Sequence, residues 1–173
     1  MAHGVQSMAA GNLARASHDN CFVWGDSAYW FADSVYTTAR NQWRVRSRGG
    51  VYFFTNFGMN SGVWLGPGSN AWNAVCDSAT KEDFKPVDRR ALLEKVAALS
   101  VRNYKMKDQD DGTRHIGPVA QDFHAAFGVG ESDKGINTAD ADGVALAAIQ
   151  ALYEQNQALS RRVAELEAKL SRE

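Results

Sequence analysis

The sequence has few cysteines, little net charge and no long apolar run, and each shortage excludes a class of protein. Cys21 and Cys76 are the only cysteines among 173 residues, too few and too isolated for a disulfide framework or a zinc site, so we expect a reducing compartment. The formal net charge of -1 gives no electrostatic basis for binding nucleic acid or an anionic membrane. No stretch approaches the roughly 18 apolar residues of a membrane span, and the N-terminus lacks the layout of a signal peptide.

Signatures of a conventional enzyme are also missing. No glycosidase carboxylate pair, phosphate-binding loop or metal motif stands out, and His115 and His124 have no third ligand at a suitable spacing. We expect both histidines to make structural hydrogen bonds. His18 and Cys21 are better explained by a turn and a buried thiol than by an active site. We therefore expect no cofactor, no metal and no external small-molecule substrate.

The composition of the chain changes near residue 75. All five tryptophans and most of the glycines precede this point, and Ala, Leu, Glu, Lys and Arg follow it in helix-forming runs. The sequence therefore predicts an α+β fold in three parts. Residues 1–75 are β-rich, residues 76–142 are mainly helical with a β-hairpin, and residues 143–173 form a long helix.

The predicted strands of residues 1–75 are short aromatic or β-branched runs. These runs are spaced about ten residues apart and are separated by turn-forming residues. They are FVWGDS, YWFADS, NQWRVRS, VYFFTNF and GVWLGPG. So few short strands cannot easily enclose a core alone, but stacking against neighbouring copies would bury them. We expect a trimeric part that is intertwined or β-roll-like.

Local signals place the elements of residues 76–142. Asp88 can cap a helix from Arg89 to about Leu99, and VRNYKMK and TRHIG flank a turn in a predicted hairpin. Pro118 begins a short helix that Gly128 ends. A loop then leads to the last helix, which Asp140 or Asp142 can cap.

The last helix carries an apolar stripe with a heptad repeat. Polar residues flank a narrow seam, which favours a coiled coil over a helix packed back on its own domain, the alternative. Asn156 within the seam is typical of a parallel dimer, whereas the run from Arg162 to Glu167 resembles a motif of trimeric coiled coils. We favour a parallel homotrimer. The seam residues are Ile149, Leu152, Asn156, Leu159, Val163, Leu166 and Leu170.

Several segments together resemble the endosialidase-type chaperone family. Within residues 72–160, five segments follow one another in the order seen in the family. They are CDSATKEDFKPVD, LLEKVAAL, YKMK, TRHIGPVAQDFHAAFG and INTADADGVALAAIQALYEQN. The family forms C-terminal domains of phage tail fibres, tailspikes and related bacterial surface proteins. The resemblance implies an intramolecular chaperone, made and assembled in the cytoplasm, that trimerises an upstream fibre and then cuts itself off. The fibre would belong to a virion tail or a bacterial or prophage surface, with a surface glycan as a partner of the full-length fibre.

The resemblance also implies the site of the cut. The family cleaves before the Ser of a Ser-Asp-x-x-x-Lys motif, where Ser is the nucleophile and Lys its base. A lysine removed from water loses its proton more readily and can accept one from the hydroxyl. Here the motif falls on Cys76, Asp77 and Lys81, which places the cut between Val75 and Cys76 in a single-turnover peptidase. Its supporting residues are Arg114, His115, Gly117 and Gln121.

Cysteine in place of the family's serine leaves three interpretations open. Cys76 can be the nucleophile, because the thiolate is reactive and a nearby lysine favours it. Alternatively, the larger sulfur disables cleavage and leaves a permanent trimerisation module. Ser78 can also substitute, although it breaks the family spacing.

A weaker resemblance concerns the N-terminal residues. SMAAGNLARASHDNCFVWGDS is similar to the Ala/Gly-rich repeats of trimeric autotransporter adhesin heads and covers one repeat. It implies strands that neighbouring chains bury. We therefore expect residues 1–75 to be the end of a longer fibre or adhesin.

Overall fold

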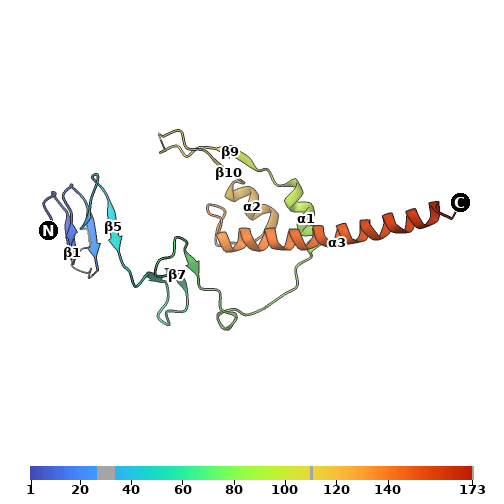
Figure 1. Cartoon of the computed structure of the whole chain (residues 1–173), viewed down its shortest axis with the longest axis horizontal. Helices are drawn as coiled ribbons and strands as arrows, with labels where there is room; N and C mark the ends of the chain where they lie inside the picture. Colours follow the sequence, from blue (N-terminus) through green and yellow to red (C-terminus); the bar gives the residue numbers. More distant parts are fainter. Residues whose placement is uncertain (27–33, 110, 173) are drawn as a thin grey trace. The chain divides into compact units, whose positions relative to one another are not determined.

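The computed structural model describes residues 1–26, 34–109 and 111–172 and divides into two units, Met1–Glu82 and Asp83–Glu173. Strands dominate the first unit and helices the second (Figure 1), so the predicted α+β class is confirmed. Most of the predicted strand YWFADS lies outside the described residues. The other four predicted runs each contain a strand.

The N-terminal strands form a small parallel roll. β1 (Met8–Gly11), β3 (Phe22–Gly25) and β5 (Trp43–Arg46) pair in that order as one parallel sheet, and β2 (Ala14–Arg15) pairs in parallel with β4 (Val35–Tyr36). Small side chains and valine form the core. The buried apolar residues are Ala14, Ala16, Cys21 and Val23, with Ala9 and Val35 packed against them.

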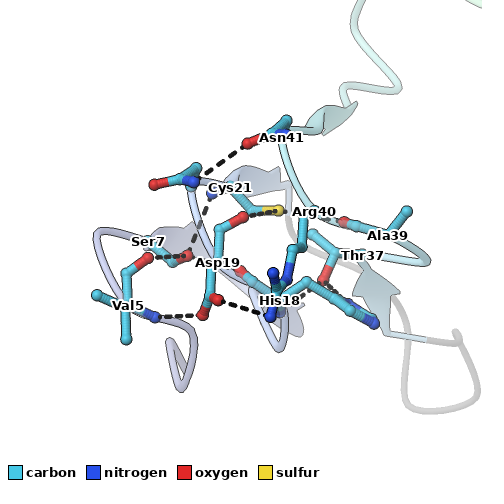
Figure 2. A network of polar contacts seen from close by, with 10 residues as sticks. Val5, Ser7, His18, Asp19, Cys21, Thr37, Ala39, Arg40 and Asn41 are labelled. Atoms are coloured by element: carbon cyan, nitrogen blue, oxygen red, sulfur yellow. Dashed lines mark hydrogen bonds and ion pairs between the residues drawn. The ribbon is translucent and has the colours of Figure 1, made fainter.

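Polar contacts fix the turns of the roll (Figure 2). Thr37 is 2% exposed, and its hydroxyl oxygen accepts from the backbone N–H of Ser17 at 3.1 Å and bonds to His18 Nδ1 at 2.8 Å. Asp19 accepts from Val5 N–H at 2.9 Å. Cys21 Sγ is buried within 3.3 Å of the Asp19 carbonyl oxygen. Turn contacts and a buried thiol, as predicted, therefore account for His18 and Cys21.

A second, antiparallel sheet follows the roll. It consists of β6 (Val51–Phe54), β7 (Gly62–Leu65) and β8 (Asn73–Ala74), with β7 in the centre. None of the described residues of this sheet is buried. Phe53 lies between Trp43 and Trp72, with ring centroids 6.2 and 5.7 Å away. The sheet is therefore held by its backbone ladder and exposed aromatic contacts rather than by a core of its own.

The first helix of the second unit is α1 (Arg89–Ala98), whose cap agrees with the prediction. Asp88 accepts from Ala91 N–H at 3.0 Å. β9 (Arg102–Tyr104) and β10 (His115–Gly117) then form the predicted antiparallel hairpin. α2 (Ala120–Phe127) follows and ends at Gly128, whose φ of 65° is the left-handed conformation that glycine tolerates best. Phe123 of α2 is buried against Phe127.

The last helix, α3 (Thr138–Leu170), begins earlier than predicted. Asn137 caps it by accepting from Ala139 N–H at 2.9 Å, so the expected caps Asp140 and Asp142 are wrong. Both lie inside the helix, where Asp140 in the first turn still complements the positive end of the dipole. α1 packs against α3, and Arg89 pairs with Glu154 at 2.8 Å. The buried residues of α3 are Ala147, Ala148 and Ala151.

Candidate functional site

Cys76 and Lys81, the two catalytic candidates from the sequence, lie against each other. Lys81 Nζ donates a hydrogen bond to Cys76 Sγ at 2.8 Å. Cys76 is a free, exposed thiol, and Lys81 is exposed as well. A cysteine is nucleophilic as the thiolate, and a lysine ammonium is a charge-assisted hydrogen-bond donor, so the pair holds the two kinds of group that covalent catalysis needs.

A short 3-10 turn brings the two side chains together. η1 (Ser78–Thr80) follows Asp77, whose carboxylate accepts from Ala79 N–H at 2.9 Å. The Thr80 hydroxyl donates to the Asp77 carbonyl oxygen at 2.7 Å, and Lys81 N–H donates to the Ser78 carbonyl at 3.1 Å. The chain therefore reverses between Cys76 and Lys81, and the lysine side chain can return to the sulfur.

Thr80 is a residue of the site that sequence reasoning missed. Asp followed three positions later by Thr offers two local side-chain-to-backbone hydrogen bonds. That spacing was visible in Asp77-Ser78-Ala79-Thr80 and could have indicated a turn. Asp77 was selected only as a family position, and the structure gives it a definite local contact.

Residues on the other side of the Val75–Cys76 bond belong to the second sheet. β8 pairs with β7, with Ala74 opposite Val63 and Asn73 opposite Trp64. Val75 continues this pairing, because its backbone N–H donates to the Gly62 carbonyl oxygen at 3.0 Å. The candidate bond therefore joins the end of a sheet to the start of the Cys76–Lys81 turn.

The supporting family residues lie on the hairpin and α2 of the second unit. Arg114 donates to the Asn103 side chain, and the His115 ring bonds to Gln109 at 2.7 Å. Gly117 belongs to β10, and Gln121 is exposed on α2. His115, as predicted for it, makes a structural hydrogen bond within the hairpin.

The predicted seam of α3 is bare in the single chain. The side of α3 that packs is its alanine stripe, which is buried next to α1, whereas every seam residue is exposed. The packing of α3 against its own unit, the alternative considered from the sequence, therefore leaves the seam uncovered. Exposures are 60% for Ile149, 53% for Leu152, 65% for Leu159, 52% for Val163, 45% for Leu166 and 72% for Leu170, and Asn156 is exposed too.

The described part of the chain contains neither a metal-binding cluster nor a membrane-spanning helix. There, no three His, Cys, Asp or Glu side chains come together in a group that could hold a metal ion. Within the same residues, none of the helices combines the length and apolarity needed to cross a bilayer.

Comparison with known protein families gives one match. Residues 76–129 match the family described as chaperone of endosialidase, a stretch that begins at Cys76 and includes the turn, α1, the hairpin and α2. No curated protein and no solved structure matches the chain, and the resemblance of the N-terminal residues to adhesin heads stays a prediction. The match supports an intramolecular chaperone role. The resemblance seen in the sequence is thereby confirmed for residues 76–129, which match the endosialidase-type chaperone family.

Proposed function

We propose that this chain is the end of a trimeric fibre joined to a chaperone that releases itself by one cut between Val75 and Cys76. The observation that carries the proposal is the hydrogen bond of 2.8 Å between Lys81 Nζ and Cys76 Sγ. It lies at the start of the chaperone-family match. The nucleophile and its proton partner are thus within the reach that covalent catalysis needs.

The chemistry uses only these two side chains and water. Cys76 Sγ, as the thiolate, attacks the carbonyl carbon of Val75, and a carbon–sulfur bond forms. The carbon–nitrogen bond then breaks, and the Cys76 amide nitrogen leaves as an amine after taking a proton from the Lys81 ammonium. Water attacks the resulting thioester and the carbon–sulfur bond breaks, which gives a carboxylate at Val75. One proton of the water goes to the Cys76 sulfur, which is again a free thiol, and the other restores the Lys81 ammonium.

Assembly is the proposed trigger of the cut. In the single chain both Cys76 and Lys81 are exposed, and water weakens every electrostatic interaction of the site. Covering the site with neighbouring copies would strengthen these interactions. The exposed seam of α3 supplies the means of assembly, because the stretch from Ile149 to Leu170 gives a contact about 30 Å long at 1.5 Å per residue.

The partners of the proposed chaperone follow from this assembly. Two further copies of the chain complete the homotrimer, and the upstream fibre or adhesin is the folding client. We place the full-length protein on a virion tail or on a bacterial or prophage surface, where the fibre meets a surface glycan. The family match to a chaperone of endosialidase supports this placement.

A second candidate function is a trimerisation module that is never cut. The substitution of the family's serine by Cys76 favours it, because catalytic sites lose much rate from small displacements of the nucleophile. Denaturing mass spectrometry separates the two functions. Fragments that end at Val75 and begin at Cys76 support the peptidase, whereas an intact mass of 18.9 kDa supports the permanent module.

Hydroxylamine is expected to trap the thioester of the proposed reaction. It should convert the fragment of residues 1–75 into a hydroxamate, because a thioester is open to attack by nitrogen nucleophiles. Denaturing mass spectrometry measures the product. Cys76→Ala should give no hydroxamate, and Cys21→Ala, which removes the buried thiol, should behave as the wild type. A hydroxamate in Cys76→Ala would show that another residue attacks Val75.

A further inference from the structure

We propose that the β6–β7–β8 sheet is the positioning element of the cleavage site, so that the chain is cut only after this sheet has formed. The inference rests on the proposed cut between Val75 and Cys76. It adds that Gly62, far from Cys76 in sequence, positions the bond. Formation of this sheet, on the fibre side of the cut, would thereby act as a checkpoint for the release of the chaperone.

The first observation is the backbone ladder that reaches the bond. β7 and β8 pair with Val63 opposite Ala74, and the next contact is the hydrogen bond of 3.0 Å from Val75 N–H to the Gly62 carbonyl oxygen. Val75 is half-buried, unlike its neighbours Ala74 and Cys76. The residue that supplies the attacked carbonyl is therefore held by the sheet.

The second observation is that the nucleophile turn belongs to the same unit. Residues 76–82 lie at the start of the chaperone-family match. They nevertheless belong to the unit Met1–Glu82 and not to the unit that contains the helices. The Asp77 turn begins directly after Cys76. The residue with the attacked carbonyl, Val75, is thus held by its hydrogen bond to the sheet. The sulfur of Cys76 is held by its hydrogen bond to Lys81 at the end of the turn.

The third observation concerns the fit of Gly62. Its φ is +144°, and a Cβ at this position would collide with the carbonyl oxygen of Phe53 in β6. Only glycine combines that conformation with so close an approach of two strands. A side chain at residue 62 would push β7 from β6 and move the carbonyl that holds Val75.

These contacts make cleavage sensitive to the sheet through geometry. An attack needs the reacting atoms close and aligned, and a displacement of about 1 Å can cost on the order of 100-fold in rate. A chain with β7 and β8 unpaired leaves Val75 free to rotate while Cys76 and Lys81 stay in contact through their own turn. Such a chain keeps its nucleophile but lacks a positioned substrate.

The test compares two glycines of the full chain. Gly62→Val breaks the sheet end, and Gly66→Val is the matched control, because a Cβ at Gly66 meets no atom within 4 Å. Denaturing mass spectrometry over time measures the fraction cut. We expect Gly62→Val to be cut about 100-fold more slowly than the wild type and Gly66→Val to be cut at the wild-type rate. Solution mass and helicity should stay unchanged in both, because α3 lies in the other unit.

A second pair of variants keeps the test valid if Gly62→Val misfolds. Val75→Pro removes the N–H that reaches Gly62, whereas Val75→Ala shortens the side chain and keeps it. We expect slow cleavage in Val75→Pro alone. Wild-type rates in both Gly62→Val and Val75→Pro would overturn the role of the sheet while leaving the peptidase intact. An uncut wild type and uncut Gly66→Val would refute the proposed cleavage, and the checkpoint with it.

Discussion

A Lys81→Ala chain is expected to stay intact under conditions in which the wild-type chain is cut between Val75 and Cys76. The substitution removes the side chain that donates to Cys76 Sγ at 2.8 Å, and with it the proton for the leaving amine. General acid–base groups contribute about 100-fold or more to such steps, so we expect at least that loss in rate. Time-resolved denaturing mass spectrometry, with an intact mass of 18.9 kDa as reference, measures it.

Lys85→Ala is the matched control for this experiment. Lys85 is an exposed lysine of the same segment, but it pairs with Asp83 at 2.6 Å rather than with the thiol. Its loss changes the net charge by the same amount and should leave the rate unchanged. If Lys81→Ala were cut as fast as Lys85→Ala, Lys81 would not be the proton partner. Equal solution masses of both variants would show that the difference does not come from assembly.

Local signals were sufficient for most of the second unit. Asp88 stands where a capping residue belongs, and Gly128 where the chain leaves α2. The hairpin flanks a turn rich in aspartate and glycine. Each of these features depends on residues close in sequence, which is why propensity and capping rules find them.

The roll of the first unit depends on contacts that local rules do not contain. β1 is Met8–Gly11, an alanine-rich run with little strand preference, and it becomes a strand because it pairs in parallel with β3. β3 pairs in turn with β5, where Phe22 lies opposite Trp43. The prediction of where α3 starts was wrong for a different reason. Asn137, Asp140 and Asp142 are all suitable capping residues, and the helix is capped by the first of them.

The residues of the candidate site could be selected from the sequence, but their geometry could not. The family resemblance selected Cys76, Asp77 and Lys81 by their spacing alone. The hydrogen bond from Val75 to Gly62 could not be inferred, because it depends on the register of two strands joined by a loop. The predicted boundary at Val75 concerns a peptide bond and stays a prediction. The structural units meet later, between Glu82 and Asp83, so the proposed cut would fall inside a folded unit.

A Leu159→Asp chain is expected to stay monomeric where the wild type forms the proposed trimer. Leu159 occupies the middle of the seam and is 65% exposed in the single chain, so the carboxylate costs little there. In a trimeric coiled coil the same position faces its symmetry mates, and three unpaired carboxylates would be buried together. We expect a cost on the order of 3 kcal/mol per chain, enough to separate the copies at micromolar concentration. Multi-angle light scattering should then report 18.9 kDa in place of three times that mass.

Gln157→Asp provides the control, because it adds the same charge on the polar side of the helix two residues away. It should leave the trimer intact. A wild-type mass of two chains would contradict the trimer and favour the dimer that Asn156 in the seam is typical of. Since the exposed site is proposed to need assembly, Leu159→Asp should also be cut more slowly than Gln157→Asp. Equal cutting of the two variants would show that Cys76 and Lys81 act without neighbouring copies.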